Sequence, residues 1–221
     1  MLRYAEHLNG HKFVAIDIAT TGNMPCFHDL VEIAAVALKP SGQIDKTIMP
    51  FQQRMQAKRK NGNYLEYAKE VDAHAANWAF ERWFEKLGLK PGKGIIPVAA
   101  SWQNQIPFLF DWFGNATDGT SFYYDFFHPK QARDLCTITS YWNDLGASNN
   151  EYFPFPKDYL PNYVRRFGLD WRKPETPLTR ALSTAEVFEK LLDTRLNAGI
   201  QLRLDFPAQQ YYDQDDPDDE E

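Results

Sequence analysis

The chain has 221 residues, of which 43% are hydrophobic and 15% aromatic, so one domain with a sizeable core accounts for its length. Its formal net charge is −6, but residues 213–221 hold seven acidic residues and no basic one. The rest of the chain has 24 basic and 23 acidic residues, so its net charge does not indicate a nucleic-acid-binding protein. No apolar run approaches the roughly 18 residues of a transmembrane helix, no signal peptide is evident, and the two cysteines match no zinc or redox spacing, so a cytoplasmic protein without membrane contact is expected.

The first fifty residues predict three strands. Residues 12–18 and 30–38 are apolar runs bounded by turn residues, and residues 43–51 alternate between apolar and polar side chains. The turns between them are short, which is typical of antiparallel neighbours. We therefore expect an antiparallel meander at the start of the domain.

The rest of the chain predicts mainly helices. After a polar stretch at 52–72, apolar residues recur at helical spacing, and one further apolar run reads as a buried strand. The expected elements are a helix at 73–87, a strand at 94–101, helices at 104–114 and 132–142, a loop at 146–158, and helices at 160–171 and 179–196. This order predicts an α/β fold with a mixed sheet flanked by helices.

The ends of the chain differ in composition from its body. We expect an N-terminal extension at 1–11, one domain at 12–206, and an acidic, disordered tail at 207–221. The tail has two functional alternatives. It could compete with ligands for a basic groove, or dock on a basic partner through the nearby aromatic residues Phe206, Tyr211 and Tyr212.

Four sequence segments, in order, resemble those of one enzyme family. FVAIDIATTG followed by LVEIAAVAL, VAASWQNQIPFLFDWF, RDLCTI, and YVRRFGLD followed by LTRALSTAEVFEKLL are similar to the motifs of the DnaQ-like (DEDDh) 3′–5′ exonucleases. The resemblance covers roughly residues 12–195. It implies an RNase H-like exonuclease fold, in which an antiparallel meander continues into parallel strands.

The resemblance also implies where a catalytic site would lie. The family uses four carboxylates to hold two divalent metals, together with a histidine as general base. Matched position by position, the first aspartate is present and the other four functional residues are replaced. These five vestigial positions are Asp17, Ala19, Gln105, Thr179 and Thr184.

Two nearby acids do not replace the missing carboxylates. Asp111 lies on the expected helix of Gln105 but points about 120° away from it, and Glu186 points about 200° away from Thr184. We therefore expect no catalytic residues, no bound metal and no other cofactor. Two Mg²⁺ or Mn²⁺ ions are implied only if the chain is an active exonuclease. Asp17 is either a remnant of the metal site or the cap of a turn.

Other residues are candidates for binding nucleic acid, each with a structural alternative. Thr20 and Thr21 could approach a nucleic-acid end or only form a turn, and Trp102 could stack on a base or belong to the core. Four basic residues could contact phosphates or form a solvated loop. They are Arg54, Lys58, Arg59 and Lys60.

Three functions follow as hypotheses. The first is a catalytically inactive, exonuclease-like module that engages a protein partner in a nucleic-acid-processing assembly. The second is a protein that binds single strands or 3′ ends of nucleic acid without cleaving them. The third is an active metal-dependent 3′–5′ exonuclease with an atypical site.

Overall fold

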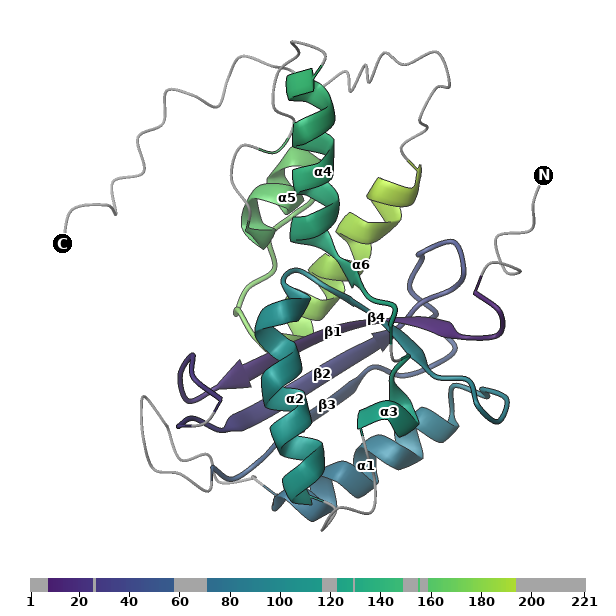
Figure 1. Cartoon of the computed structure of the whole chain (residues 1–221), viewed down its shortest axis with the longest axis vertical. Helices are drawn as coiled ribbons and strands as arrows, with labels where there is room; N and C mark the ends of the chain where they lie inside the picture. Colours follow the sequence, from purple (N-terminus) through teal and green to yellow (C-terminus); the bar gives the residue numbers. More distant parts are fainter. Residues whose placement is uncertain are drawn as a thin grey trace, which may run out of the picture.

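A five-stranded sheet forms the centre of the computed structural model (Figure 1), in which we describe residues 8–25, 27–57, 71–116, 123–128, 130–148, 155 and 159–193. The strands are β1 (Lys12–Thr20), β2 (Leu30–Ala37), β3 (Phe51–Arg54), β4 (Ile95–Ala99) and β5 (Arg133–Asp134). Their order is β3-β2-β1-β4-β5. β3, β2 and β1 pair antiparallel, whereas β4 and β5 continue the sheet in parallel. The predicted meander and mixed sheet are confirmed.

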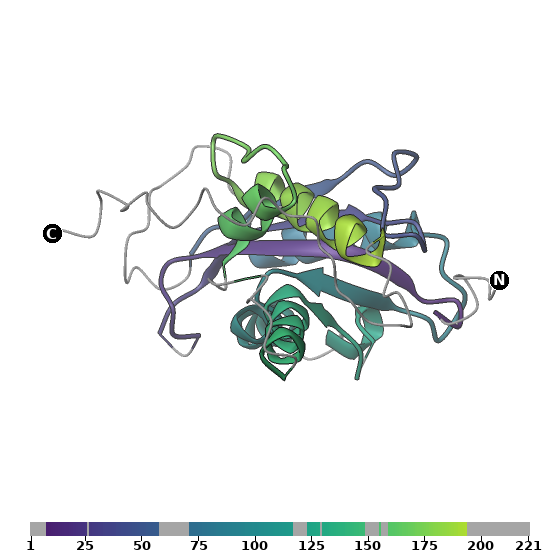
Figure 2. The same cartoon turned by 90° about the horizontal axis from the view of Figure 1, so that it is seen from above.

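Six helices accompany the sheet within the described residues. They are α1 (Ala73–Glu85), α2 (Trp102–Ala116), α3 (Tyr123–Phe126), α4 (Leu135–Ser148), α5 (Leu160–Arg166) and α6 (Pro177–Asp193). α6 lies on one side of the sheet and α2 on the other (Figure 2). None of these helices has the length and apolar character needed to cross a membrane.

Alternate residues of the central strand enter two separate cores. Val14 and Ile16 join a cluster that α1, α2 and α3 complete, rich in aromatic rings around Phe80. Phe13 and Ala15 join a second cluster with α4, α5 and α6. β1 therefore reads as a continuous apolar run because helices cover both of its faces.

The third strand was predicted in the wrong place. Residues 43–51 were expected to form it, but β3 begins at Phe51, and earlier only Ile44 makes an isolated bridge, to Leu38. A turn replaces the strand because the Asp45 carboxylate accepts hydrogen bonds from both the backbone and the hydroxyl of Thr47.

Two short elements were not predicted, α2 and α4 are longer than expected, and α5 ends at Arg166 rather than at 171. α3 has four residues and lies between the predicted elements, and the two residues of β5 occupy the start of the helix expected at 132–142. α4 runs to Ser148, so it includes the start of the loop expected at 146–158. The acidic tail, the first seven residues of the N-terminal extension and most of that loop lie outside the described residues.

Candidate functional site

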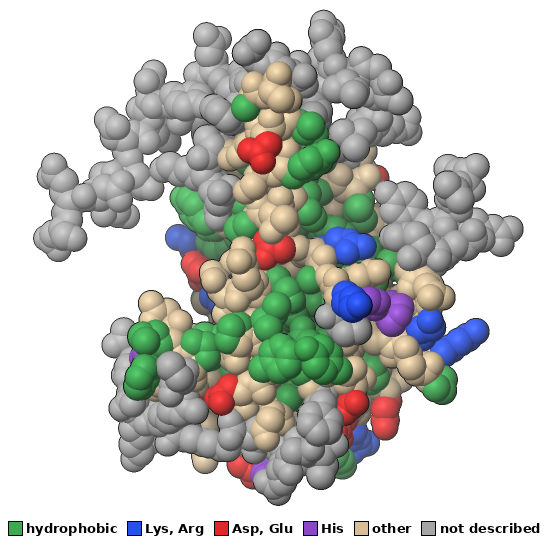
Figure 3. All heavy atoms as spheres, viewed as in Figure 1, with side chains coloured by type: hydrophobic (Ala, Val, Ile, Leu, Met, Phe, Trp, Pro, Cys, Tyr) green, Lys and Arg blue, Asp and Glu red, His purple; other side chains and the backbone are tan. Residues whose placement is uncertain are grey.

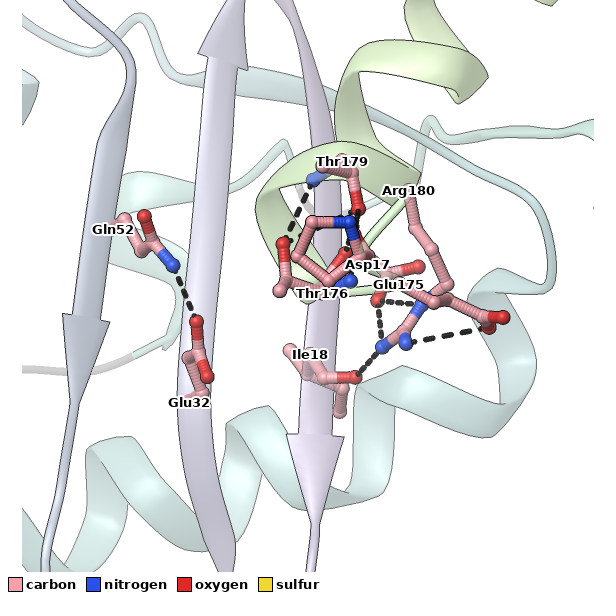
Figure 4. A network of polar contacts seen from close by, with 9 residues as sticks. Asp17, Ile18, Glu32, Gln52, Glu175, Thr176, Thr179 and Arg180 are labelled. Atoms are coloured by element: carbon pink, nitrogen blue, oxygen red, sulfur yellow. Dashed lines mark hydrogen bonds and ion pairs between the residues drawn. The ribbon is translucent and has the colours of Figure 1, made fainter. Parts of the chain in front are cut away.

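Asp17 lies near the carboxyl end of β1, on the face that α6 covers, and its side chain is buried. Its carboxylate is held by Arg180 of α6 (Figure 4). Nε and Nη2 of Arg180 lie 2.8 Å and 2.6 Å from Oδ1 of Asp17, and Nη2 also donates to the Ile18 carbonyl at 2.9 Å. The carboxylate is therefore neither a turn cap nor open to solvent, because a guanidinium covers it.

The environment of Asp17 opposes its ionisation. Burial raises the pKa of the Asp17 carboxyl from 3.8 to about 6, and the Arg180 guanidinium offsets only part of this rise. Glu175 adds a small rise from the other side of Arg180, where its Oε1 lies 3.7 Å from Nη1. At neutral pH the carboxyl is still mostly ionised, so the contact with Arg180 is an ion pair.

Thr179, at the position of the family histidine, caps its own helix. Its Oγ1 accepts a hydrogen bond from the Thr176 amide at 2.8 Å, and the Thr176 hydroxyl accepts one from the Thr179 amide at 3.2 Å. This reciprocal pair is a capping box around the first turn of α6. The side chain is thus engaged with the backbone, and its hydroxyl has no basic group to offer a reaction.

Ala19, at the position of the second family carboxylate, lies directly opposite Glu32 of β2. Residues opposite each other in an antiparallel pair project to the same face, so Glu32 lies on the face to which a side chain at position 19 projects. Its carboxylate accepts from Gln52 Nε2 at 2.6 Å (Figure 4) and forms an ion pair with Arg54 at 2.9 Å. A second buried carboxylate on this face is therefore also neutralised by an arginine.

The remaining two positions carry neutral side chains. Gln105 lies on α2, 8% exposed, and Thr184 lies fully buried on α6. Neither Oε1 of Gln105 nor Oγ1 of Thr184 has a hydrogen-bond partner among the described residues. A buried polar atom without a partner costs free energy, but neither atom carries the charge that a metal ligand set requires.

Thr20 and Thr21 build the turn after β1. The Thr20 hydroxyl donates to the Gly22 carbonyl at 2.6 Å, and Thr21 exchanges hydrogen bonds with Asp29 through its amide and its hydroxyl. The His28 ring lies against Gly22, where a Cβ would meet Cδ2 at 2.4 Å. A side chain at position 22 would therefore have to displace the His28 ring, and the hydrogen bonds of Thr20 and Thr21 stabilise the turn itself.

The other candidate residues lie at separate places in the fold and do not form one site. Trp102 is 5% exposed, with its ring 5.9 Å from that of Phe127, so it is a core residue and unavailable for stacking on a base. Glu186 forms an ion pair with Arg172. Asp111 lies half-buried on α2. Lys58, Arg59 and Lys60 lie outside the described residues.

The residues at the vestigial positions do not fit two divalent metals. Such a centre needs several carboxylate oxygens, whereas only Asp17 supplies one and Arg180 already binds it. Within the described parts of the chain, no three His, Cys, Asp or Glu side chains come close enough to share a metal ion. This face therefore presents two ion pairs between an arginine and a buried carboxylate.

Sequence reasoning missed the two residues that dominate this face. Arg180 follows the vestigial Thr179 directly, so an arginine beside the last motif was a usable signal, because a buried aspartate needs a cation. Glu32 could be found from the register of the meander, which pairs it with Ala19. Neither residue belongs to the motif positions themselves.

Comparisons with known proteins address the fold. No protein-family model matches the sequence, and a search of curated proteins finds no significant match. Among solved structures, cell-death related nuclease 4 is similar with a TM-score of 0.62 and 14% identity, over 82% of this chain and 63% of that one. The nuclease domain of 3′hExo, a DEDDh family member bound to rAMP, is similar with a TM-score of 0.56 and 15% identity, over 82% and 91%.

A third similar structure is Exonuclease I of E. coli in complex with a dT13 oligonucleotide, with a TM-score of 0.56 and 13% identity, over 82% of this chain and 41% of that one. The chain thus spans less than two thirds of the length of the first and third structures. At these identities the likeness concerns the fold. The chain has the RNase H-like fold of the DEDDh exonucleases, as its motifs imply.

Proposed function

We propose that this chain is a non-catalytic, exonuclease-like module in which an internal ion pair takes the place of the metal centre. The observation that carries the proposal is the guanidinium of Arg180 on the Asp17 carboxylate, 2.6 Å from Oδ1. A metal that bound Asp17 would have to displace this guanidinium from both the carboxylate and the Ile18 carbonyl. The Arg180 side chain, which is 24% exposed, would then lose its carboxylate partner, and a largely buried charge without a partner costs free energy.

The neutral side chains around the pair support the same proposal. A single displaced arginine would free one carboxylate, and the other family positions would still supply Ala19, Gln105, Thr179 and Thr184. Two divalent ions held this way would keep most of their charge uncompensated. Hydrated metal ions have little reason to leave water for such a site.

We expect the protein to leave single-stranded DNA and RNA intact in millimolar Mg²⁺ or Mn²⁺. The measurement is a gel assay of end-labelled oligonucleotides, with an active 3′–5′ exonuclease as the positive control. The melting temperature, recorded in the same buffers, should shift by less than about 1 °C. A metal that bound the folded chain would raise it, since a ligand at a hundredfold excess over its Kd adds about 2.7 kcal/mol of stability. Metal-dependent shortening from the 3′ end that Asp17→Asn abolishes would overturn the proposal.

The role that remains for such a scaffold is binding, and we assign it a protein partner within a nucleic-acid-processing assembly. Exposed apolar side chains beside the vestigial positions support this role. Met24 and Phe27, in the loop that follows β1, are 48% and 55% exposed. Large apolar side chains gathered at one edge of a protein are typical of interaction sites.

Substituting both side chains should remove such a partner. We expect Met24→Ser with Phe27→Ser to lose the proteins that co-purify with the wild-type chain from its native cells, at an unchanged melting temperature. Both purifications are treated with nuclease, so that proteins bridged by nucleic acid are removed. Retention of the same nuclease-resistant proteins by the double variant would contradict this role for the loop.

A further inference from the structure

A cluster of stacked aromatic rings lies on α2 and α3. Phe110 stacks on Tyr123 with ring centroids 4.2 Å apart, and Tyr123 stacks on Phe127 at 4.6 Å. Tyr124 stands edge-on to Phe110 and Tyr123 at 5.6 Å and 5.3 Å. Phe110 and Tyr124 are 40% and 58% exposed, so two rings fixed by their neighbours face solvent.

A group of cations and histidines begins where α3 ends. The His128 amide donates to the Ile95 carbonyl, and its ring lies 4.6 Å from that of His11. The charges of Lys93 and Arg133 act on His128, and Lys130, whose backbone amide donates to Nδ1 of His128 at 3.1 Å, follows two residues later; none of these three cations is paired to a carboxylate among the described residues. This basic cluster consists of His11, His128, Lys93, Lys130 and Arg133.

The electrostatics of His128 reflect this one-sided charge. Partial burial lowers the pKa of the His128 imidazole, and His11, Arg133 and Lys93 lower it further by repulsion. Among the described residues, no acidic group contributes an opposing effect on this pKa. The site therefore favours an anion, since a bound phosphate would relieve the repulsion among the cations.

The two features are held together by close backbone contacts. Gly94 follows Lys93, and a Cβ on it would lie 2.7 Å from the carbonyl oxygen of Phe126 in α3. His11 Nδ1 accepts from the Gly94 amide at 2.9 Å. Figure 3 shows hydrophobic side chains gathered over α2 and α3, with Lys, Arg and His side chains beside them.

We propose that this surface, formed by Phe110, Tyr124 and the basic cluster, binds single-stranded nucleic acid. Exposed rings take the faces of unpaired bases, and cations beside them take the phosphates of the same strand, a combination used by proteins that bind single strands. An apolar protein segment would use the rings but would leave the cations uncompensated. Asp111 and Asp125 lie on α2 and α3, so the phosphates belong at the basic cluster rather than over the rings.

Two residues of the basic cluster, His11 and Lys93, lie apart from Asp17. His11 and Lys93 precede β1 and β4, which are parallel, whereas Asp17 lies near the carboxyl end of β1. These two residues are therefore at the other end of the sheet from Asp17, whereas Phe110 shares α2 with Gln105 and Arg133 pairs with Val98 near the carboxyl end of β4. Binding at this surface does not depend on whether the chain is an active nuclease. It can be measured in EDTA, where no metal-dependent hydrolysis occurs.

The test is fluorescence anisotropy of labelled oligothymidylate and oligouridylate of about 12 nucleotides, a length within the site sizes of single-strand binders. Tyr124→Ala should weaken binding about tenfold, which corresponds to the loss of one stacked base. Lys93→Glu with Lys130→Glu should weaken it further and reduce the slope of log K against log salt by about 1.4, or roughly 0.7 for each phosphate contact. Circular dichroism and melting curves verify that the variants fold.

Matched controls come from the rest of the described surface. Tyr141→Ala removes a 60% exposed ring from α4, and Lys39→Glu with Lys86→Glu reverses two exposed charges elsewhere. Both controls should bind within about twofold of the wild-type chain, given that isolated exposed charges contribute little. The proposal is wrong if the wild-type chain does not bind the oligonucleotides at low salt, or if the test variants bind as tightly as their controls. It is also wrong if Tyr124→Ala weakens binding but the affinity does not change with salt concentration.

Discussion

Replacing Arg180 by leucine is expected to cost about 2–4 kcal/mol of unfolding free energy at pH 7.5. Removing one partner of a buried ion pair typically costs about 3–5 kcal/mol, and the lower range applies because 24% of the Arg180 side chain is exposed. The loss arises because the Asp17 carboxylate would remain buried with no cation on it. Denaturant unfolding at constant slope measures the difference.

Two variants separate the ion pair from packing. Arg180→Lys keeps the positive charge but loses the planar fork, so we expect an intermediate loss. Arg165→Leu on α5 removes an exposed arginine that no carboxylate contacts among the described residues, and should cost less than about 0.5 kcal/mol. An Arg180→Leu variant as stable as Arg165→Leu would show that the pair does not hold α6 to β1.

The second large effect is a dependence of stability on pH. The pKa of Asp17 is about 6 in the folded chain and 3.8 in an ordinary environment, so between these values the unfolded chain binds fewer protons than the folded one. Stability from this group is therefore full below pH 4 and falls as the pH rises through 6. The shift of about two units corresponds to about 3 kcal/mol.

Asp17→Asn removes this titration and should flatten the profile of unfolding free energy between pH 4 and pH 7. The comparison is made as the difference between the two chains, since other groups titrate equally in both. Arg180→Leu should also cost less at pH 5 than at pH 7.5, because a protonated Asp17 no longer needs the guanidinium. A wild-type profile parallel to that of Asp17→Asn would contradict the raised pKa.

The strands that carry large apolar side chains on both faces could be predicted from the sequence. β1 and β2 lie in the middle of the sheet, where burial on both sides produces an unbroken apolar run. β3 could not be located in this way, because it is a four-residue edge strand whose Gln52 and Arg54 serve the Glu32 carboxylate rather than the core. Its polar sequence resembles that of a loop.

The contacts of Asp17 could not be predicted from the sequence, although motif spacing singles out its position. Motif spacing identifies Asp17 and Thr179 because each lies at a fixed distance from the end of a strand or the start of a helix. The partner of Asp17 lies 163 residues away and is one of 24 basic residues in the chain. Only the packing of α6 across β1 and β2 decides which of them reaches the carboxylate.

That packing also determines when the domain can close during its synthesis. α6 supplies Ala181, Ala185 and Phe188 to the core on the face of β1 that carries Phe13. A nascent chain that lacks residues 177–193 leaves this face of its central strand exposed to water, even though the meander of β1, β2 and β3 has long left the ribosome. The last described helix, α6, is therefore needed to complete the core, and β1, the first strand to be synthesised, is among the last to be buried.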